Sequence, residues 1–135
     1  MNDRFWIVNG ALLAGAGVAA GAIGTHFLKE TLHLPEAELQ TYDVAVRYQM
    51  VHALALVFVG LLVARYESRW LNAAGCCFLA GIVLFSGGLY AWVFSGIKPF
   101  VHVVPVGGFS WIVGWLLLAA GALTARKTAP PGTSV

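Results

Sequence analysis

Apolar and polar positions follow one another along the chain in long blocks. Four apolar blocks, at residues 5–28, 48–64, 71–94 and 101–123, are each close to the roughly 20 residues that a helix needs to cross a bilayer. Because backbone groups in hydrocarbon must bond within their own segment, each block predicts a membrane-spanning helix. The pattern therefore predicts an all-α integral membrane protein, with one four-helix transmembrane domain over residues 1–125.

Polar residues collect between these blocks. The longest connection, residues 29–47, contains Pro35 followed by Glu36 and Glu38, which favours a helix start because acids suit the positive end of the helix dipole. Its apolar residues share one side, which predicts a short amphipathic segment on the membrane surface; alternatively, it continues straight into the second span as one long helix. Residues 126–135 are polar, and we expect them to form a disordered tail.

The composition supports a membrane location. The chain is 59% hydrophobic and only 10% charged, which leaves too little polar surface to cover a water-soluble protein. The net charge of +2 comes from scattered residues, so we expect no nucleic-acid partner. The adjacent Cys76 and Cys77 do not suit a disulfide and are interpreted as small apolar filler.

The basic residues predict an orientation. One side of the membrane would receive Arg4, Arg65, Arg69, Arg126 and Lys127, and the other would receive Lys29, Arg47 and Lys98. Since lysine and arginine favour the cytoplasmic side, both termini are predicted to be cytoplasmic. The acidic connection between the first two spans would then lie at the outer face.

Small residues form a stripe along the first span. Gly10, Ala14, Gly17 and Gly21 recur at three- and four-residue spacing, so they share one face of a helix. Such a face allows close approach of another helix. It predicts packing within the bundle or, alternatively, a seam between copies in a homo-oligomer.

Polar side chains from several spans are predicted to lie at one depth near the outer face. Converting sequence distance to depth at about 1.5 Å per residue places them together in a small polar pocket. The cluster comprises His26, Arg47, Tyr48, Gln49, His52, Ser86 and Tyr90, with His102 just above it.

Three of these residues are candidate metal ligands. His26, His52 and His102 could hold copper, zinc or a haem iron. However, the spans contain no His-x-x-x-His pair, and no cysteine or carboxylate lies at that depth. We therefore assign no metal site and keep the histidines as candidates only, and we interpret the polar side chains as forming hydrogen bonds between helices.

Two glycines open the last span. Gly107 and Gly108 follow Pro105, which favours a helix start packed closely against the third span. Alternatively, exposed amide groups at this helix end would bind an anion.

Four motifs occur in order over nearly the whole chain. They are Gly21-Ala-Ile-Gly-Thr-His26, Arg47-Tyr-Gln-Met-Val-His52, Leu84-Phe-Ser-Gly-Gly-Leu-Tyr90, and Pro105-Val-Gly-Gly108 followed by Gly114-Trp115. With them the chain resembles a small four-helix membrane family described as a domain of unknown function, with YgdD-like and YwdK-like bacterial members. The resemblance implies a four-span protein of the bacterial inner membrane and supplies no activity.

The residues favour a non-enzymatic function. No nucleophile stands with a base in a recognisable arrangement, and no paired carboxylates occur within a span. We predict an accessory or interaction protein whose smooth first helix docks onto a larger membrane complex. Alternatively, the protein has a pocket for a quinone, a lipid or a metal or haem cofactor, which remains unidentified. That pocket would use Arg47, Tyr48 and Lys98, with an aromatic wall of Trp92, Phe94, Phe100 and Trp111.

Overall fold

The computed structural model describes residues 2–97, 100 and 102–127. Lys98 and residues 128–135 of the predicted tail lie outside the described residues. In chain order the elements are α1 (Asp3–Ala22), the π-helical η1 (Ile23–Lys29), α2 (Glu36–Val63), β1 (Tyr66–Glu67), α3 (Arg69–Gly81), the π-helical η2 (Ile82–Ser86), α4 (Gly87–Ser95), α5 (Val104–Thr124) and β2 (Arg126–Lys127).

Four helical stretches are long and apolar enough to cross a membrane. They are Asp3–Lys29, Glu36–Val63, Arg69–Ser95 and Val104–Thr124. The prediction of an all-α integral membrane protein with four spans is confirmed.

The helix predicted to start near Pro35 begins at Glu36 and continues without a break to Val63. The connection and the second span are therefore one long helix, and residues 36–47 do not form a separate surface segment. The physical reason lies at Tyr42, which is 2% exposed and whose hydroxyl donates to the Ala20 carbonyl over 2.9 Å. The apolar side of this stretch packs against the first span.

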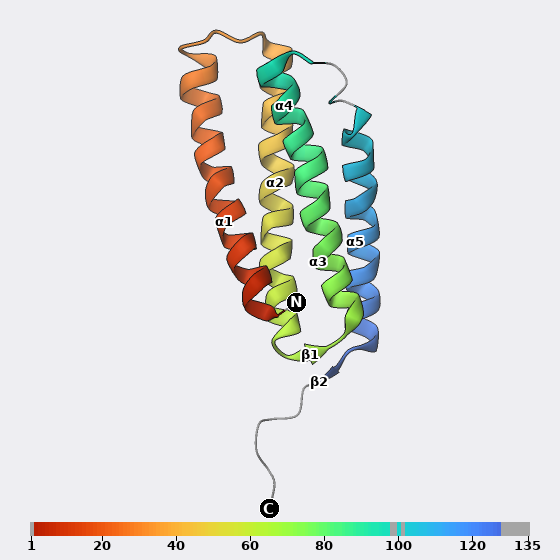
Figure 1. The fold of residues 1–135 in the computed structure, drawn as a ribbon. Helices are drawn as coiled ribbons and strands as arrows, with labels where there is room; N and C mark the ends of the chain where they lie inside the picture. The colour runs from red at the N-terminus through yellow and green to blue at the C-terminus, as the bar shows by residue number, and fades with distance from the viewer. Residues whose placement is uncertain (1, 98–99, 101, 128–135) are drawn as a thin grey trace, which may run out of the picture.

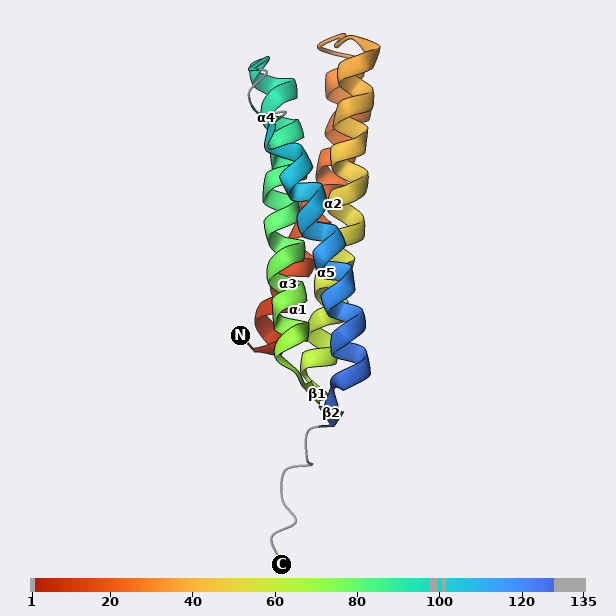
Figure 2. The same cartoon turned by 90° about the vertical axis from the view of Figure 1, so that its right-hand side faces the viewer.

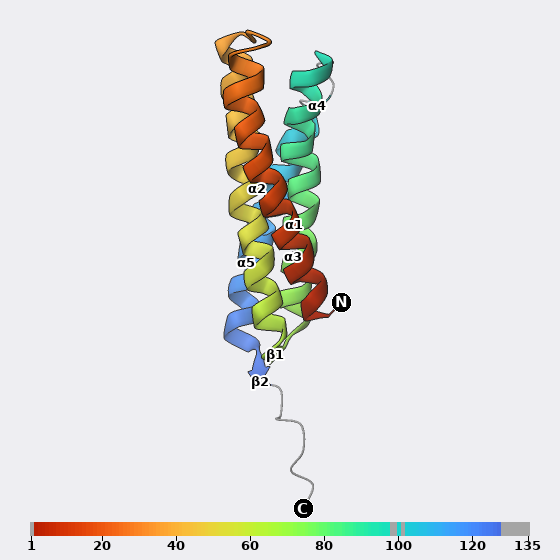
Figure 3. The same cartoon turned by 90° about the vertical axis from the view of Figure 1, so that its left-hand side faces the viewer.

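The helices pack as two pairs. α1 packs along α2, α5 packs along α3, and α2 lies against α3 and η2 to join the pairs (Figure 1). Figures 2 and 3 show the α1–α2 pair and α4 diverging toward the end away from the termini. At the other end β1 and β2 pair antiparallel, with Tyr66 opposite Lys127 and Glu67 opposite Arg126. Residues 126 and 127, which the sequence assigned to the tail, thus take part in a strand pair.

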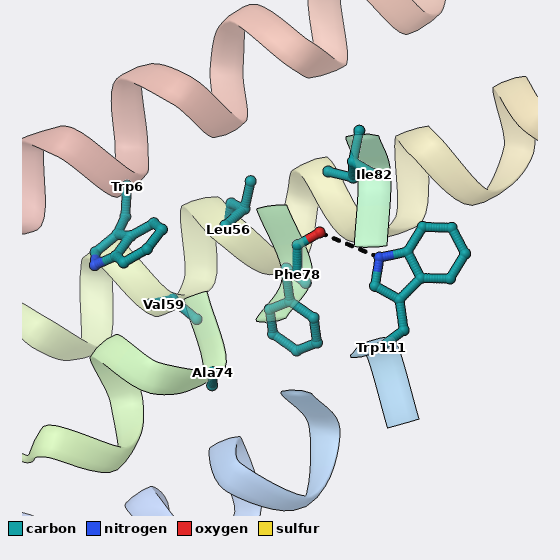
Figure 4. Packing of buried hydrophobic residues seen from close by; sticks show 8 residues of the cluster. Trp6, Leu56, Val59, Ala74, Phe78, Ile82 and Trp111 are labelled. Atoms are coloured by element: carbon teal, nitrogen blue, oxygen red, sulfur yellow. Dashed lines mark hydrogen bonds between the residues drawn. The ribbon is translucent and has the colours of Figure 1, made fainter. Parts of the chain in front are cut away.

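A cluster of buried side chains joins the two pairs (Figure 4). Trp6 of α1 is fully buried and donates from Nε1 to Oδ1 of Asn72 on α3 over 2.9 Å. Its indole fits because residue 75 is glycine, where a Cβ atom would lie 2.7 Å from the ring. The other members are Ala55, Leu56, Val59, Ala74, Phe78, Ile82 and Trp111.

The predicted stripe of small residues faces α2. A Cβ atom at Gly10 would lie 2.7 Å from the Ala53 carbonyl oxygen, and one at Gly17 would lie 2.5 Å from Sδ of Met50. A Cβ atom at Gly21 would lie 3.7 Å from Cγ1 of Val46. Ala14, which lies between Gly10 and Gly17 in the stripe, is half-buried. The stripe therefore serves packing within the chain, and α2 covers it against any partner.

Candidate functional site

Part of the predicted polar cluster forms hydrogen bonds between helices. Gln49 donates from Nε2 to the Leu13 carbonyl over 2.8 Å and accepts at Oε1 from the Tyr90 hydroxyl over 2.9 Å. The Ser86 hydroxyl donates to the Ala45 carbonyl over 2.9 Å. In the described part of the chain every buried side-chain nitrogen or oxygen has a partner. These groups connect α1, α2, η2 and α4.

His52 belongs to a separate aromatic arrangement. Its ring stacks on Trp111 with 3.8 Å between centroids and 2° between planes. Its Nδ1 lies 2.9 Å from the Tyr48 carbonyl oxygen, and its Nε2 lies 3.2 Å from Nε1 of Trp115. Because a carbonyl only accepts and an indole N–H only donates, His52 is neutral with its proton on Nδ1. Both nitrogens are then occupied.

The other predicted members lie apart from these groups. His26 is exposed, with its Nδ1 3.7 Å from Oε2 of Glu30. Since Gly24 packs against Tyr42, ten residues before His52 on α2, the two histidines are separated by roughly 15 Å along the helix axis.

The expected common depth is therefore wrong for His26. His102 and Arg47 are also exposed. Among the described residues, no three histidine, cysteine, aspartate or glutamate side chains are grouped to hold a metal ion.

A groove of about 440 Å³ lies between α2 and α5, and we call it the α2–α5 groove. Tyr48 is 44% exposed there. Its ring stacks on that of Trp111, with 5.5 Å between centroids and 10° between planes, and its centroid lies 5.2 Å from that of Phe85. The groove is lined by Tyr48, Val51, His52, Phe85, Gly108, Trp111, Ile112 and Trp115.

Glycines and a π turn shape this groove. A Cβ atom at Gly107 would lie 2.5 Å from the Phe85 backbone nitrogen, so α5 and η2 are in close contact there. A Cβ atom at Gly108 would instead lie 3.8 Å from the Phe85 ring, so there is space beside this glycine. The Gly87 N–H bonds to the Ile82 carbonyl across a π turn, which sets the direction of Phe85. The geometry therefore agrees with the close-packing interpretation for Gly107 but not for Gly108.

The sequence did not identify the whole groove. Of the predicted aromatic wall only Trp111 lines it, whereas Phe85 and Trp115 were missed. The available signal was the four-residue spacing of Trp111 and Trp115, which matches that of Tyr48 and His52.

A second small-residue face was also missed. Ala11, Gly15 and Ala19 lie at four-residue spacing on α1, and all three are exposed. A Cβ atom at Gly15 would meet no described atom within 4 Å, and Leu12 and Val18 beside it are 68% and 65% exposed. At 100° per residue this face lies about 130° around the helix from the one that packs on α2.

Comparisons with known proteins agree on one family. The model of the family described as "Protein of unknown function (DUF423)" matches residues 20–108. The UPF0382 inner membrane protein YgdD of Escherichia coli K12 is 32% identical over 127 residues, which cover 94% of this chain and 95% of that protein. A UPF0382 membrane protein of Staphylococcus aureus is 37% identical over 115 residues, which cover 85% of this chain and 92% of that protein. One of Staphylococcus epidermidis is 35% identical over 120 residues, which cover 89% of this chain and 96% of that protein. No solved structure gives a significant match.

Proposed function

The chain belongs to the DUF423 family, and from this premise we propose that it is a non-enzymatic interaction protein that docks onto a larger membrane complex. The docking surface is the outward face of α1. The observation that carries the proposal is the open space over Gly15, between the exposed Ala11 and Ala19.

The geometry of α1 suits helix association in a bilayer. There, helices associate through close packing, and small residues at four-residue spacing let two backbones approach. Leu12 and Val18 flank the small residues and would pack against the sides of an incoming helix. Because α2 covers a different face of α1, α1 can bridge this chain and a partner.

The polar side chains within the spans support a non-enzymatic role. The Ser86 hydroxyl is bonded to the Ala45 carbonyl, and His52 has both ring nitrogens occupied. Neither side chain contacts the other as a nucleophile and base would.

The proposed orientation places both termini in the cytoplasm. Arg4 and Arg65 belong to the end where β1 pairs with β2, and Arg69 and Arg126 lie there too. Basic residues favour the cytoplasmic side of an inner membrane. A fluorescent protein that matures only in the cytoplasm, fused after Val135, is expected to be bright. A bright periplasm-specific reporter at the same position would reverse the orientation.

The docking face is tested with the matched pair Gly15→Leu and Gly15→Ala. The full chain is extracted gently from its own membrane, and its assemblies are weighed by native mass spectrometry. We expect the wild-type chain and Gly15→Ala to remain in a larger complex and Gly15→Leu to be released, because leucine fills the space that a partner helix needs. Persistence of the complex in Gly15→Leu contradicts the proposal. If the mass shows only copies of this chain, the partner is a second copy of the chain and the proposal of a larger complex is wrong.

A further inference from the structure

Two grooves of nearly equal volume open toward the bilayer, but their walls differ. The groove between α1 and α3 has a volume of about 430 Å³ and is lined by Phe5, Trp6, Cys76, Leu79, Ala80, Val83 and Leu84. The α2–α5 groove has a volume of about 440 Å³, and its wall contains four aromatic rings and an imidazole. Either groove is large enough for a lipid acyl chain, so an acyl chain would not explain why the walls differ. The larger number of rings in the α2–α5 groove indicates a ligand with a flat ring.

The α2–α5 groove retains one available hydrogen-bond donor. Nε1 of Trp111 donates to the Phe78 carbonyl, and Nε1 of Trp115 donates to His52. His52 itself donates to the Tyr48 carbonyl. In contrast, no described residue bonds to the Tyr48 hydroxyl, although the Tyr48 ring is held in place by stacking on Trp111.

The depth of the groove indicates an uncharged ligand. Counting from Val104, the first residue of α5, Gly108 and Trp115 lie roughly 6 and 16 Å along the helix axis. The groove thus lies in the half of a hydrocarbon core about 30 Å thick that is nearer to Val104. Its lining includes no lysine, arginine, aspartate or glutamate to neutralise a charged headgroup.

We propose that the α2–α5 groove binds a membrane quinone. The planar ring lies against the accessible parts of Phe85 and Trp115, because Trp111 is only 4% exposed and is covered by the His52 ring. A quinone carbonyl accepts a hydrogen bond from the Tyr48 hydroxyl, and the apolar tail extends into the bilayer. Offset stacking of aromatic rings is favourable beyond the area that it buries. The volume and the mostly apolar lining with one placed polar group are typical of small-molecule sites. This site is separate from the outward face of α1, so the two proposals fail independently.

The site is tested with decylubiquinone and the full chain in nanodiscs, by quenching of tryptophan emission. The wild-type chain is expected to show saturable quenching. Gly108→Phe fills the groove and is expected to weaken binding at least tenfold. Its Cβ would make only ordinary contact with the Phe85 ring, at 3.8 Å, so α5 keeps its place. Leu116→Phe introduces the same side chain outside the groove lining, at a residue that is 67% exposed, and is expected to retain the wild-type affinity.

Tyr48→Phe provides a second variant that preserves the ring stack. It removes only the donor, so the affinity is expected to fall roughly 2- to 12-fold, as for the loss of one hydrogen bond. Quenching that rises linearly and equally in all variants would show partitioning into the bilayer alone and would overturn the proposal. A phospholipid that copurifies with the wild type and is lost in Gly108→Phe, without saturable quinone quenching, would assign the groove to an acyl chain instead.

Discussion

His52 is held in one tautomer by its two neighbours. A proton on Nε2 would place two donors face to face, because the Trp115 indole N–H points at that nitrogen over 3.2 Å. The Tyr48 carbonyl at 2.9 Å requires the proton on Nδ1. We therefore expect nitrogen NMR of the labelled protein in bilayers to show a neutral imidazole protonated at Nδ1.

Trp115→Phe provides the control for this tautomer. It keeps an aromatic ring beside His52 but removes the donor, so the Nε2 resonance is expected to shift while the Nδ1 resonance stays. The lost hydrogen bond should destabilise the fold by about 1 kcal/mol. A wild-type spectrum with the proton on Nε2 would disprove the assigned contacts.

At the scale of elements, the two glycines that open α5 have different roles. A Cβ atom at Gly107 would lie 2.5 Å from the Phe85 backbone nitrogen, whereas one at Gly108 would lie 3.8 Å from the Phe85 ring. Gly107→Ala must push α5 away from η2, at an expected cost of roughly 1–3 kcal/mol. Gly108→Ala should be neutral or slightly stabilising, since alanine favours a helix. Thermal unfolding in detergent measures the difference, and equal midpoints for the two variants would contradict it.

The elements also show what the sequence could and could not predict. Apolar length alone identified the four spans, because backbone polar groups in hydrocarbon must hydrogen-bond to one another within a helix. The long reach of α2 was left open, since Tyr42 could equally have packed on headgroups or on the first span. The π turn at Ile82–Ser86 has no signature in residue type.

The site was partly predictable for a related reason. Spacing correctly groups Tyr48 with His52 on one face, but it does not say which helix that face meets. The structure places Trp111 and Trp115 there, and His26 lies elsewhere. Local periodicity therefore identifies the faces of each helix, while the choice of neighbours depends on packing across the whole bundle.

For the whole molecule, Trp6 connects α1 directly to α3 of the other helix pair. It is fully buried, bonded to Asn72 and seated on Gly75 of α3. Trp6→Ala removes this connection and is expected to lower the free energy of unfolding by about 3–5 kcal/mol. Trp70→Ala at the same end is the control, because Trp70 is 37% exposed and its loss should cost far less. Equal losses would show that α1 is held by α2 alone.

The two-pair arrangement has a consequence for biosynthesis. α1 and α2 are consecutive in the chain and pack on one another, and the same holds for the α3–α4 span and α5. Each hairpin can therefore close as soon as its second helix has left the ribosome and entered the bilayer. The antiparallel pairing of Tyr66–Glu67 with Arg126–Lys127 requires the segment after α5, so among the described contacts it is the last that translation makes possible.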